Sequence, residues 1–214
     1  MKELFNISFK EAQHLRKEFL SENSNVDHVT IQTNNSVLVS APHAVSQCRL
    51  GKPKVAEIGT VSTALLFAKA TNSNLIIKTK NNDDDANYDE DCDYRKTIAN
   101  MIKTQNIKYL IDFHGLAKFR PCDINLGCNF SQNTKPNQKL FLSLKSALET
   151  AGFTVFVDEP FCAGPKTISG YFAKNFNIWT VQIEINCNIT NNPKNTSKYN
   201  LLLNTLTDWF NRNY

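Results

Sequence analysis

Two histidines and a glutamate, far apart in the sequence, are the side chains best suited to bind a metal ion. His43 follows the strand-like run 36–41, and His114 follows the run 109–113. Ligands collect at the carboxyl ends of strands in open α/β sheets, and Glu57 begins an apolar helical segment that would pack beside them. Two imidazoles and one carboxylate are a ligand set for catalytic zinc, with a fourth position left for water. The alternative is a set of surface polar residues that never meet.

A second carboxylate lies on the apolar segment 178–185. Strand alternation places Gln182, Glu184 and Asn186 on one face and the isoleucines on the other. A glutamate on so apolar a strand is costly to bury unless it is paired or used. Beside a zinc-bound water, Glu184 would act as a general base and then donate a proton to a leaving amine. A structural ion pair with a nearby Lys or Arg is the alternative.

Strand-like and helix-like segments alternate along the chain. Short apolar or alternating runs predict strands at 26–32, 36–41, 75–78, 109–113, 122–127, 153–157 and 178–185. Helical spacing of apolar residues predicts helices at 9–20, 57–69, 95–104, 137–151, 168–175 and 199–210. No repeat, linker or low-complexity block divides the chain. We therefore expect one α/β domain over residues 1–214, folded as a three-layer α/β/α sandwich with a mixed central sheet.

The composition excludes several classes of protein. A hydrophobic content of 41% and a charged content of 21% over 214 residues are ordinary for a soluble globular protein. The net charge of +4 is mild and forms no basic stripe, so no nucleic-acid partner is expected. No apolar run is long enough to cross a bilayer, and no apolar leader follows Met1, which predicts a cytoplasmic protein with no membrane partner. The six cysteines contain no C-x-x-C pair and are expected to be free thiols.

Five short motifs occur in order between about residues 36 and 187: Pro42-His43, the helix that starts at Glu57, Asp112-Phe113-His114-Gly115, Asp123-Ile124-Asn125-Leu126-Gly127, and Gln182-Ile183-Glu184-Ile185-Asn186. In this order they resemble the N-formylglutamate amidohydrolase-like family, a relative of the zinc carboxypeptidases. The resemblance implies a phosphorylase/hydrolase-like α/β/α fold and one zinc ion. It implies that His43, Glu57 and His114 are the ligands and that Glu184 is the catalytic carboxylate. It also implies that Asp112 orients a metal ligand from behind.

The residues that would bind the substrate depart from the family pattern. Family members often carry an arginine soon after the strand glutamate, whereas Cys187-Asn188-Ile189 stands here. A carboxylate on the substrate would then need another cation, preferably an arginine with its planar fork. Each such cation has the alternative of being a solvated surface residue. The candidates for substrate binding are Arg95, Arg120, Lys166, Asn87 and Asn186.

An acidic run extends from Asp83 to Asp93. Its oxygen atoms could bind a hard cation. However, it lacks the D-x-[DN]-x-[DN]-G pattern with a distal glutamate, so we expect a solvated loop near the mouth of the site.

These patterns predict a zinc-dependent amidohydrolase or peptidase. Its substrate would be a small N-acyl amino acid or a peptide, cleaved at an amide bond. Two alternatives stay open. One is a catalytically silent α/β domain that binds a metal, peptide or metabolite, and the other is a magnesium-dependent phosphohydrolase that uses the acidic run.

Overall fold

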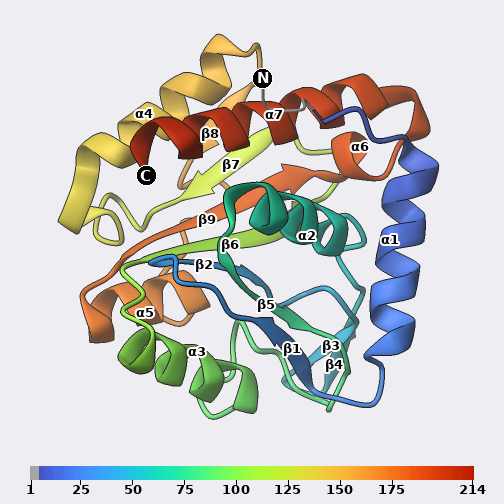
Figure 1. Ribbon diagram of the computed structural model, residues 1–214. Coiled ribbons are helices and arrows are strands. Elements are labelled where there is room, and N and C mark those ends of the chain that lie inside the picture. Colours follow the sequence, from blue (N-terminus) through green and yellow to red (C-terminus); the bar gives the residue numbers. More distant parts are fainter. Residues whose placement is uncertain (1–4) are drawn as a thin grey trace.

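The computed structural model describes residues 5–214, in which helices cover both faces of a seven-stranded sheet (Figure 1). The strands of the main sheet are β1 (His28–Ile31), β2 (Val37–Ala41), β5 (Asn74–Lys78), β6 (Tyr109–Leu116), β7 (Ile124–Gly127), β8 (Val155–Val157) and β9 (Trp179–Asn186). The α-helices are α1 (Phe9–Glu22), α2 (Thr60–Thr71), α3 (Asp93–Thr104), α4 (Gln138–Thr150), α5 (Ile168–Phe176), α6 (Cys187–Thr190) and α7 (Thr196–Asn213). The predicted three-layer α/β/α sandwich is confirmed.

The main sheet is mixed, with the strand order β1-β5-β2-β6-β9-β7-β8. Strands β5, β2, β6 and β9 run parallel in its middle, while β1 and the β7–β8 pair run the other way. Every residue of β2, β5 and β9 is buried, as expected for strands covered on both faces. Because β2, β6 and β9 are parallel and adjacent in this order, their carboxyl ends meet at one edge of the sheet.

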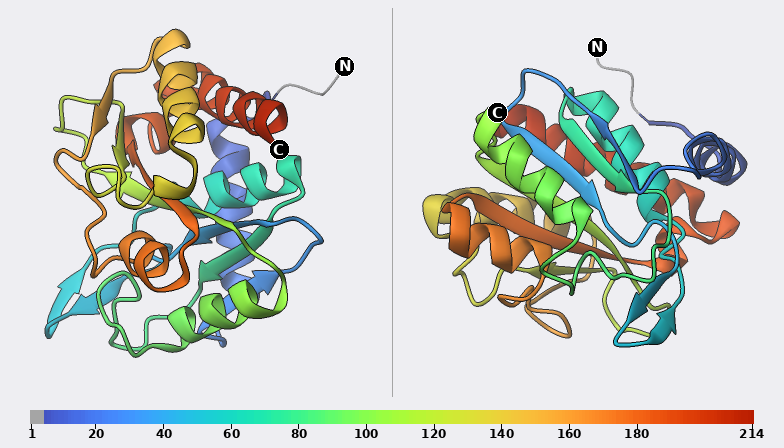
Figure 2. Two further views of the ribbon diagram at one scale, coloured as in Figure 1. Left: turned by 90° about the vertical axis from the view of Figure 1, so that its left-hand side faces the viewer. Right: turned by 90° about the horizontal axis from the view of Figure 1, so that it is seen from below.

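The helices form two layers with separate cores (Figure 2). Apolar residues of α1, α2, α4 and α7 join one buried cluster on one face of the sheet, among them Phe67 and Leu203. Residues of α3 and α5 form the second cluster on the other face, among them Ile98 and Phe172. The sheet therefore separates two apolar cores. Polar side chains can gather at the edge where the carboxyl ends of its parallel strands meet.

Helix ends follow the local sequence. Ser8 and Glu11 form a capping box at the start of α1, where each side chain accepts from the other residue's backbone N–H. Helix α2 ends at Asn72, with φ of 51°, and α5 ends at Asn177, with φ of 54°, both in the left-handed conformation that asparagine tolerates. Gly152 follows α4 with φ of 91°, the left-handed conformation that glycine commonly adopts just after a helix.

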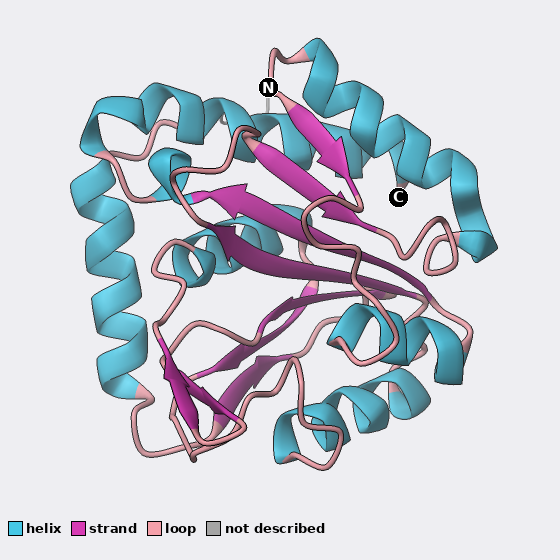
Figure 3. Ribbon diagram, turned by 180° about the vertical axis from the view of Figure 1, so that it is seen from behind, coloured by secondary structure: helices cyan, strands magenta, loops and turns pink. Residues whose placement is uncertain are grey.

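Three features differ from the sequence-based expectation. Residues 47–54, for which the sequence predicted no strand, form a hairpin of β3 (Gln47–Arg49) and β4 (Lys52–Lys54) apart from the main sheet (Figure 3). Its turn has positive φ at Leu50 and Gly51, a geometry that short hairpins favour. Helix α2 begins at Thr60, so Glu57 lies in the turn before it. Strand β6 continues to Leu116, so His114 lies inside the strand rather than beyond its end.

The described residues 5–214 include no helix with both the length and the apolar character of a membrane span. All six cysteines lie in this part of the chain and are free thiols, as predicted.

Lys78 on β5 is a buried cation that joins two loops to the sheet. Its side chain is 2% exposed, and its ammonium donates to Asp27 and to Asp84, with an Nζ–Oδ2 distance of 2.7 Å to Asp84. The pairing fixes the start of the acidic run, because Asp84 directly precedes Asp85 in the chain.

We expect Lys78→Met to destabilise the protein by about 3 kcal/mol, because two partly buried carboxylates lose their cation. Urea unfolding at neutral pH measures this change. The pKa of Asp27 is lowered: burial raises it, but His28 and Lys78 outweigh burial. The Asp27 contribution is therefore present above the ordinary aspartate pKa and is lost as the pH falls through the lowered value, so the difference between variant and wild type should shrink in acid.

Lys96→Met is the matched control, since Lys96 forms only exposed ion pairs with Asp91 and Asp93. It should leave the urea midpoint near that of the wild type. Equal losses for both variants would contradict the importance assigned to Lys78.

Candidate metal centre and active site

His43, Glu57 and His114 meet at the carboxyl edge of the sheet. His43 Nδ1 lies 2.7 Å from Glu57 Oε1, and His114 Nδ1 lies 3.2 Å from Glu57 Oε2. The two imidazole rings are 4.7 Å apart between centroids and nearly perpendicular. One potential ligand atom from each of the three residues lies within 4.8 Å of the others. The three side chains can therefore bind a single metal ion.

The parallel sheet brings these residues together. Strands β2 and β6 pair so that Ser40 lies opposite Asp112, which places His43 and His114 beside each other. Two hydrogen bonds hold the turn that carries Glu57: its N–H donates to O of His43, just after β2 (2.9 Å), and its Oε2 accepts from Gly115 N on β6 (2.8 Å). Glu57 thus reaches the histidines through backbone contacts that fix its position.

Each histidine is held from behind by a buried aspartate. His43 Nε2 lies 2.9 Å from Asp85 Oδ1, and His114 Nε2 lies 3.1 Å from Asp112 Oδ2. Both aspartates are fully buried. With its Nε2 bound to a carboxylate, each ring presents its Nδ1 to Glu57. This is the carboxylate–histidine arrangement that commonly orients metal ligands.

The electrostatics of the cluster favour positive charge at its centre. Burial alone would lower the pKa of both histidines, but Glu57 and Asp85 raise the pKa of His43, and Asp112 and Glu57 raise that of His114. Conversely, burial would raise the pKa of Glu57, but the two histidines lower it. A divalent cation between the Nδ1 atoms and Glu57 would supply the positive charge that the carboxylates favour. The donor set therefore fits a metal ion.

Glu184 lies beside His114, since the two residues are paired in the register of β6 and β9. Its Oε1 accepts from Gln182 Nε2 at 2.6 Å, and no hydrogen bond among the described residues involves its Oε2. Burial raises the pKa of Glu184 to about 7, although His114 opposes the rise. A carboxyl group with a pKa near neutrality is suited to accept and return a proton.

A cavity of about 290 Å³ opens over this cluster. His43, Glu57, His114 and Glu184 line it, together with cationic side chains from the hairpin and from the loop before α5: Arg49, Lys54 and Lys166. Arg49 Nε donates to Asp85 Oδ2 at 2.7 Å, and its guanidinium carbon lies 5.0 Å from the centre of the Tyr88 ring. The cavity is small, and three cationic side chains lie around it.

Two of the predicted substrate-binding residues reach this cavity. Lys166 and Asn87 line it, although Asn87 Oδ1 also accepts from Ile168 N and so fixes the start of α5. Arg95 is buried elsewhere and donates to Ala86 O and Lys166 O. Asn186 donates to Arg120 O and Cys122 O, while Arg120 lines a different cavity. In the structure, Arg95 and Asn186 therefore hold loop backbone near the cavity through hydrogen bonds to carbonyl oxygens.

The acidic run contains the residue that the sequence analysis missed. Asp85 was expected in a solvated loop, but it is fully buried between His43 and Arg49. This corrects the expectation for Asp84 as well, because Asp84 pairs with Lys78. Nothing in the local sequence separates Asp85 from Asp83 and Asp84, so its burial could not be predicted.

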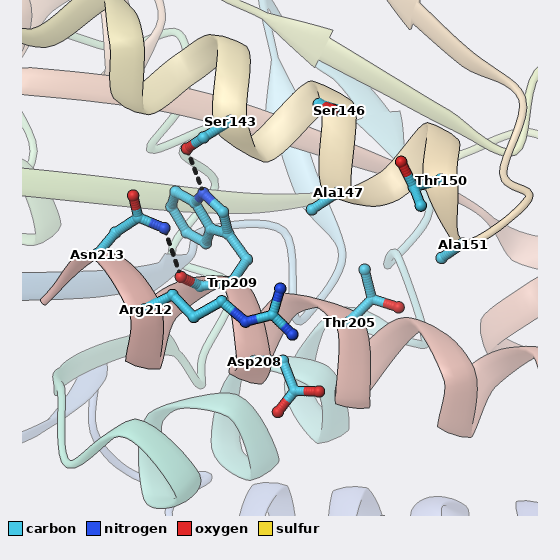
Figure 4. A pocket seen from close by; sticks show the side chains of 10 residues that line it. All are labelled: Ser143, Ser146, Ala147, Thr150, Ala151, Thr205, Asp208, Trp209, Arg212 and Asn213. Atoms are coloured by element: carbon cyan, nitrogen blue, oxygen red, sulfur yellow. Dashed lines mark hydrogen bonds between the residues drawn. The ribbon is translucent and has the colours of Figure 1, made fainter.

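A separate cavity of about 440 Å³ lies between α4 and α7 (Figure 4). Trp209 Nε1 donates to Ser143 Oγ across it at 2.9 Å. None of the candidate ligands lines this cavity, so it is distinct from the site at the sheet edge.

Comparisons with known proteins agree with this architecture. No protein-family model and no curated protein sequence matches the chain. Among solved structures, N-formylglutamate amidohydrolase from Ralstonia eutropha has a TM-score of 0.61 at 14% identity, over 88% of this chain and 99% of that chain. A bacteriophage poly-γ-glutamate hydrolase has a TM-score of 0.53 at 17% identity, over 92% of this chain and 93% of that chain. A metallo-carboxypeptidase from Burkholderia cenocepacia has a TM-score of 0.51 at 13% identity, over 86% of this chain and 61% of that chain.

The chain therefore has the fold shared by these amidohydrolases and metallo-carboxypeptidases. This confirms the predicted N-formylglutamate amidohydrolase-like fold. At 13–17% identity, this likeness establishes the fold alone.

Gly115 sets the distance between β6 and Glu57, which generates a prediction about metal binding. A Cβ at Gly115 would lie 2.9 Å from Glu57 Cβ and 3.2 Å from its Cγ. We expect Gly115→Ala to displace Glu57 and weaken zinc binding about tenfold, a size typical of disturbed ligand support. Competition with a chromogenic chelator measures the affinity.

Gly164→Ala is the control, because its Cβ would meet only Cys162 Sγ, at 3.8 Å. This variant should bind zinc as the wild type does. If Gly115→Ala also binds zinc with wild-type affinity, Glu57 is not held in place by this contact.

Proposed function

We propose that the protein is a zinc-dependent hydrolase that cleaves an amide bond of a small N-acyl amino acid or peptide. The observation that carries this proposal is the convergence of His43, Glu57 and His114 with Glu184 paired beside His114. The fold shared with N-formylglutamate amidohydrolase and metallo-carboxypeptidases supports it. The six free cysteines are consistent with a cytoplasmic setting, which we include in the proposal.

His43, Glu57 and His114 would bind one zinc ion through two imidazole nitrogens and a carboxylate. When bound, zinc would polarise the amide carbonyl and make an attacking water more acidic. Asp85 and Asp112 would keep the two imidazoles oriented, since each already accepts from the Nε2 of one ring.

Glu184 would move the proton in this reaction. Its Oε1 is held by Gln182, so Oε2 is the oxygen left to accept a proton from the attacking water. It would then return the proton to the departing nitrogen, which leaves as a neutral amine. Lys166 and Asn87 line the same cavity and would contact the amine half of the substrate.

A catalytically silent binding domain is the second candidate. The state of Arg49 favours it. This side chain lines the cavity, but it is already paired with Asp85 and is therefore not free to bind a substrate carboxylate. The magnesium-dependent alternative has less support, because His43, Glu57 and His114 form the one group of potential metal ligands within the described residues 5–214.

We expect Glu184→Gln to retain stoichiometric zinc and to lose at least about a hundredfold in kcat, because general acid–base catalysis typically contributes that much or more. Metal content by mass spectrometry, together with amine release from N-formyl, N-acetyl and dipeptide substrates, measures both effects.

His114→Ala is the paired variant, and it should lose the zinc. Zinc retained by His114→Ala would refute the ligand assignment, and wild-type turnover by Glu184→Gln would refute the proposed base. Stoichiometric zinc without hydrolysis of any amide would favour the binding domain.

A further inference from the structure

Two of the three candidate metal ligands, Glu57 and His114, line two neighbouring cavities. Glu57, His114 and Gly115 line the 290 Å³ cavity described above and also a larger one of about 630 Å³. Phe161 and Lys54 line both as well. A molecule that spans the two cavities would have its two halves in different surroundings.

The two cavities differ in polarity. Glu184, Gln182, Arg49 and Lys166 line the smaller cavity only, Arg120 lines the larger one only, and Lys54 lines both. The larger one is lined mainly by apolar side chains: Val55, Ile58, Leu116, Ala117, Phe161 and Ile185. Val55 is 87% exposed and Ile58 is 37% exposed, so its apolar lining includes side chains that the fold leaves in contact with water. An apolar ligand group would cover this surface favourably.

The position of Glu184 determines which half of an amide enters which cavity. Glu184 lines the smaller cavity and is absent from the walls of the larger one. The departing nitrogen must lie beside Glu184 to receive its proton. The amine half therefore belongs in the smaller cavity and the acyl half in the larger one.

We propose that the larger cavity is an acyl subsite and that the preferred substrates carry a bulky, apolar acyl group. This inference rests on the proposed function. A water molecule occupies about 30 Å³ in the liquid, and a formyl group is of comparable size. A formyl group would therefore fill little of a cavity of about 630 Å³, and its apolar lining would stay in contact with water.

A series of N-acyl derivatives of one amino acid tests this assignment. With the zinc-loaded protein, kcat/KM should rise from N-formyl through N-acetyl and N-butanoyl to N-hexanoyl, by up to roughly fourfold for each methylene buried. Equal or falling kcat/KM along the series would overturn the subsite while leaving the hydrolase proposal intact.

Ala117→Trp tests the location of the subsite, because Ala117 is exposed and lines the larger cavity only. A tryptophan there should fill the cavity and lower the ratio of kcat/KM for N-hexanoyl over N-formyl substrate at least about tenfold, the loss of two buried methylenes or more. The small residue in Ala117→Ser should preserve the ratio. An unchanged ratio in Ala117→Trp would overturn the assignment.

A binding measurement separates this inference from the proposed function. Hexanoate and acetate are the acid products of two substrates in the series, and calorimetry can measure their affinities for the zinc-loaded protein. If no amide is cleaved but hexanoate binds more tightly than acetate and Ala117→Trp removes the difference, the apolar subsite stands and the hydrolase proposal fails. If hexanoate shows no advantage over acetate, the subsite fails whatever the activity.

Discussion

The structure depends on the concentration of buried carboxylates around two imidazoles. Glu57, Asp85, Asp112 and Glu184 are all packed against His43 and His114, where water is largely excluded. Burying so many acidic groups is unfavourable unless positive charge compensates them. The raised pKa values of both histidines are one form of that compensation, and a divalent cation is another. The buried carboxylates therefore make the binding of a cation at this site favourable.

The sheet topology makes this arrangement possible. Neighbouring parallel strands β2, β6 and β9 end at the same edge, so His43, His114 and Glu184, which are far apart in the sequence, line one cavity. Apolar layers on both faces hold the strands rigidly, while Gly115 allows the Glu57 turn to approach β6 closely. The Lys78 ion pairs fix the acidic run so that Asp85 can reach His43. Precise placement of the ligands thus follows from packing and from ion pairs outside the site.

Much of the fold and the centre of the site could be predicted from the sequence. Apolar runs of strand length located β2, β5, β6 and β9. The expectation that ligands gather at the carboxyl ends of parallel strands brought His43 and His114 together, although His114 lies within the last residues of β6. Strand alternation placed Glu184 on the face of β9 that carries Gln182. These inferences succeeded because backbone periodicity determines which residues share a face or an edge.

The rest depended on contacts that local sequence does not encode. The β3–β4 hairpin has no apolar periodicity, and its position is fixed through Arg49 and Cys48, which bond to Asp85 and Asp84 of the acidic run. Asp85 resembles its solvated neighbours in sequence, and only the tertiary structure buries it. Arg95 was expected near the substrate because arginine suits carboxylates, yet it bonds the carbonyls of Ala86 and Lys166. Polar side chains are ambiguous in sequence because their partners are distant in the chain.

We propose that His43, Glu57 and His114 bind one zinc ion, and anomalous diffraction at the zinc edge, from crystals grown with zinc, can locate that ion. A single strong peak is expected about 2.0–2.1 Å from the Nδ1 atoms of both histidines and about 2.0–2.2 Å from a Glu57 oxygen. A zinc-free site between the histidines, or a peak at the acidic run instead, would contradict it.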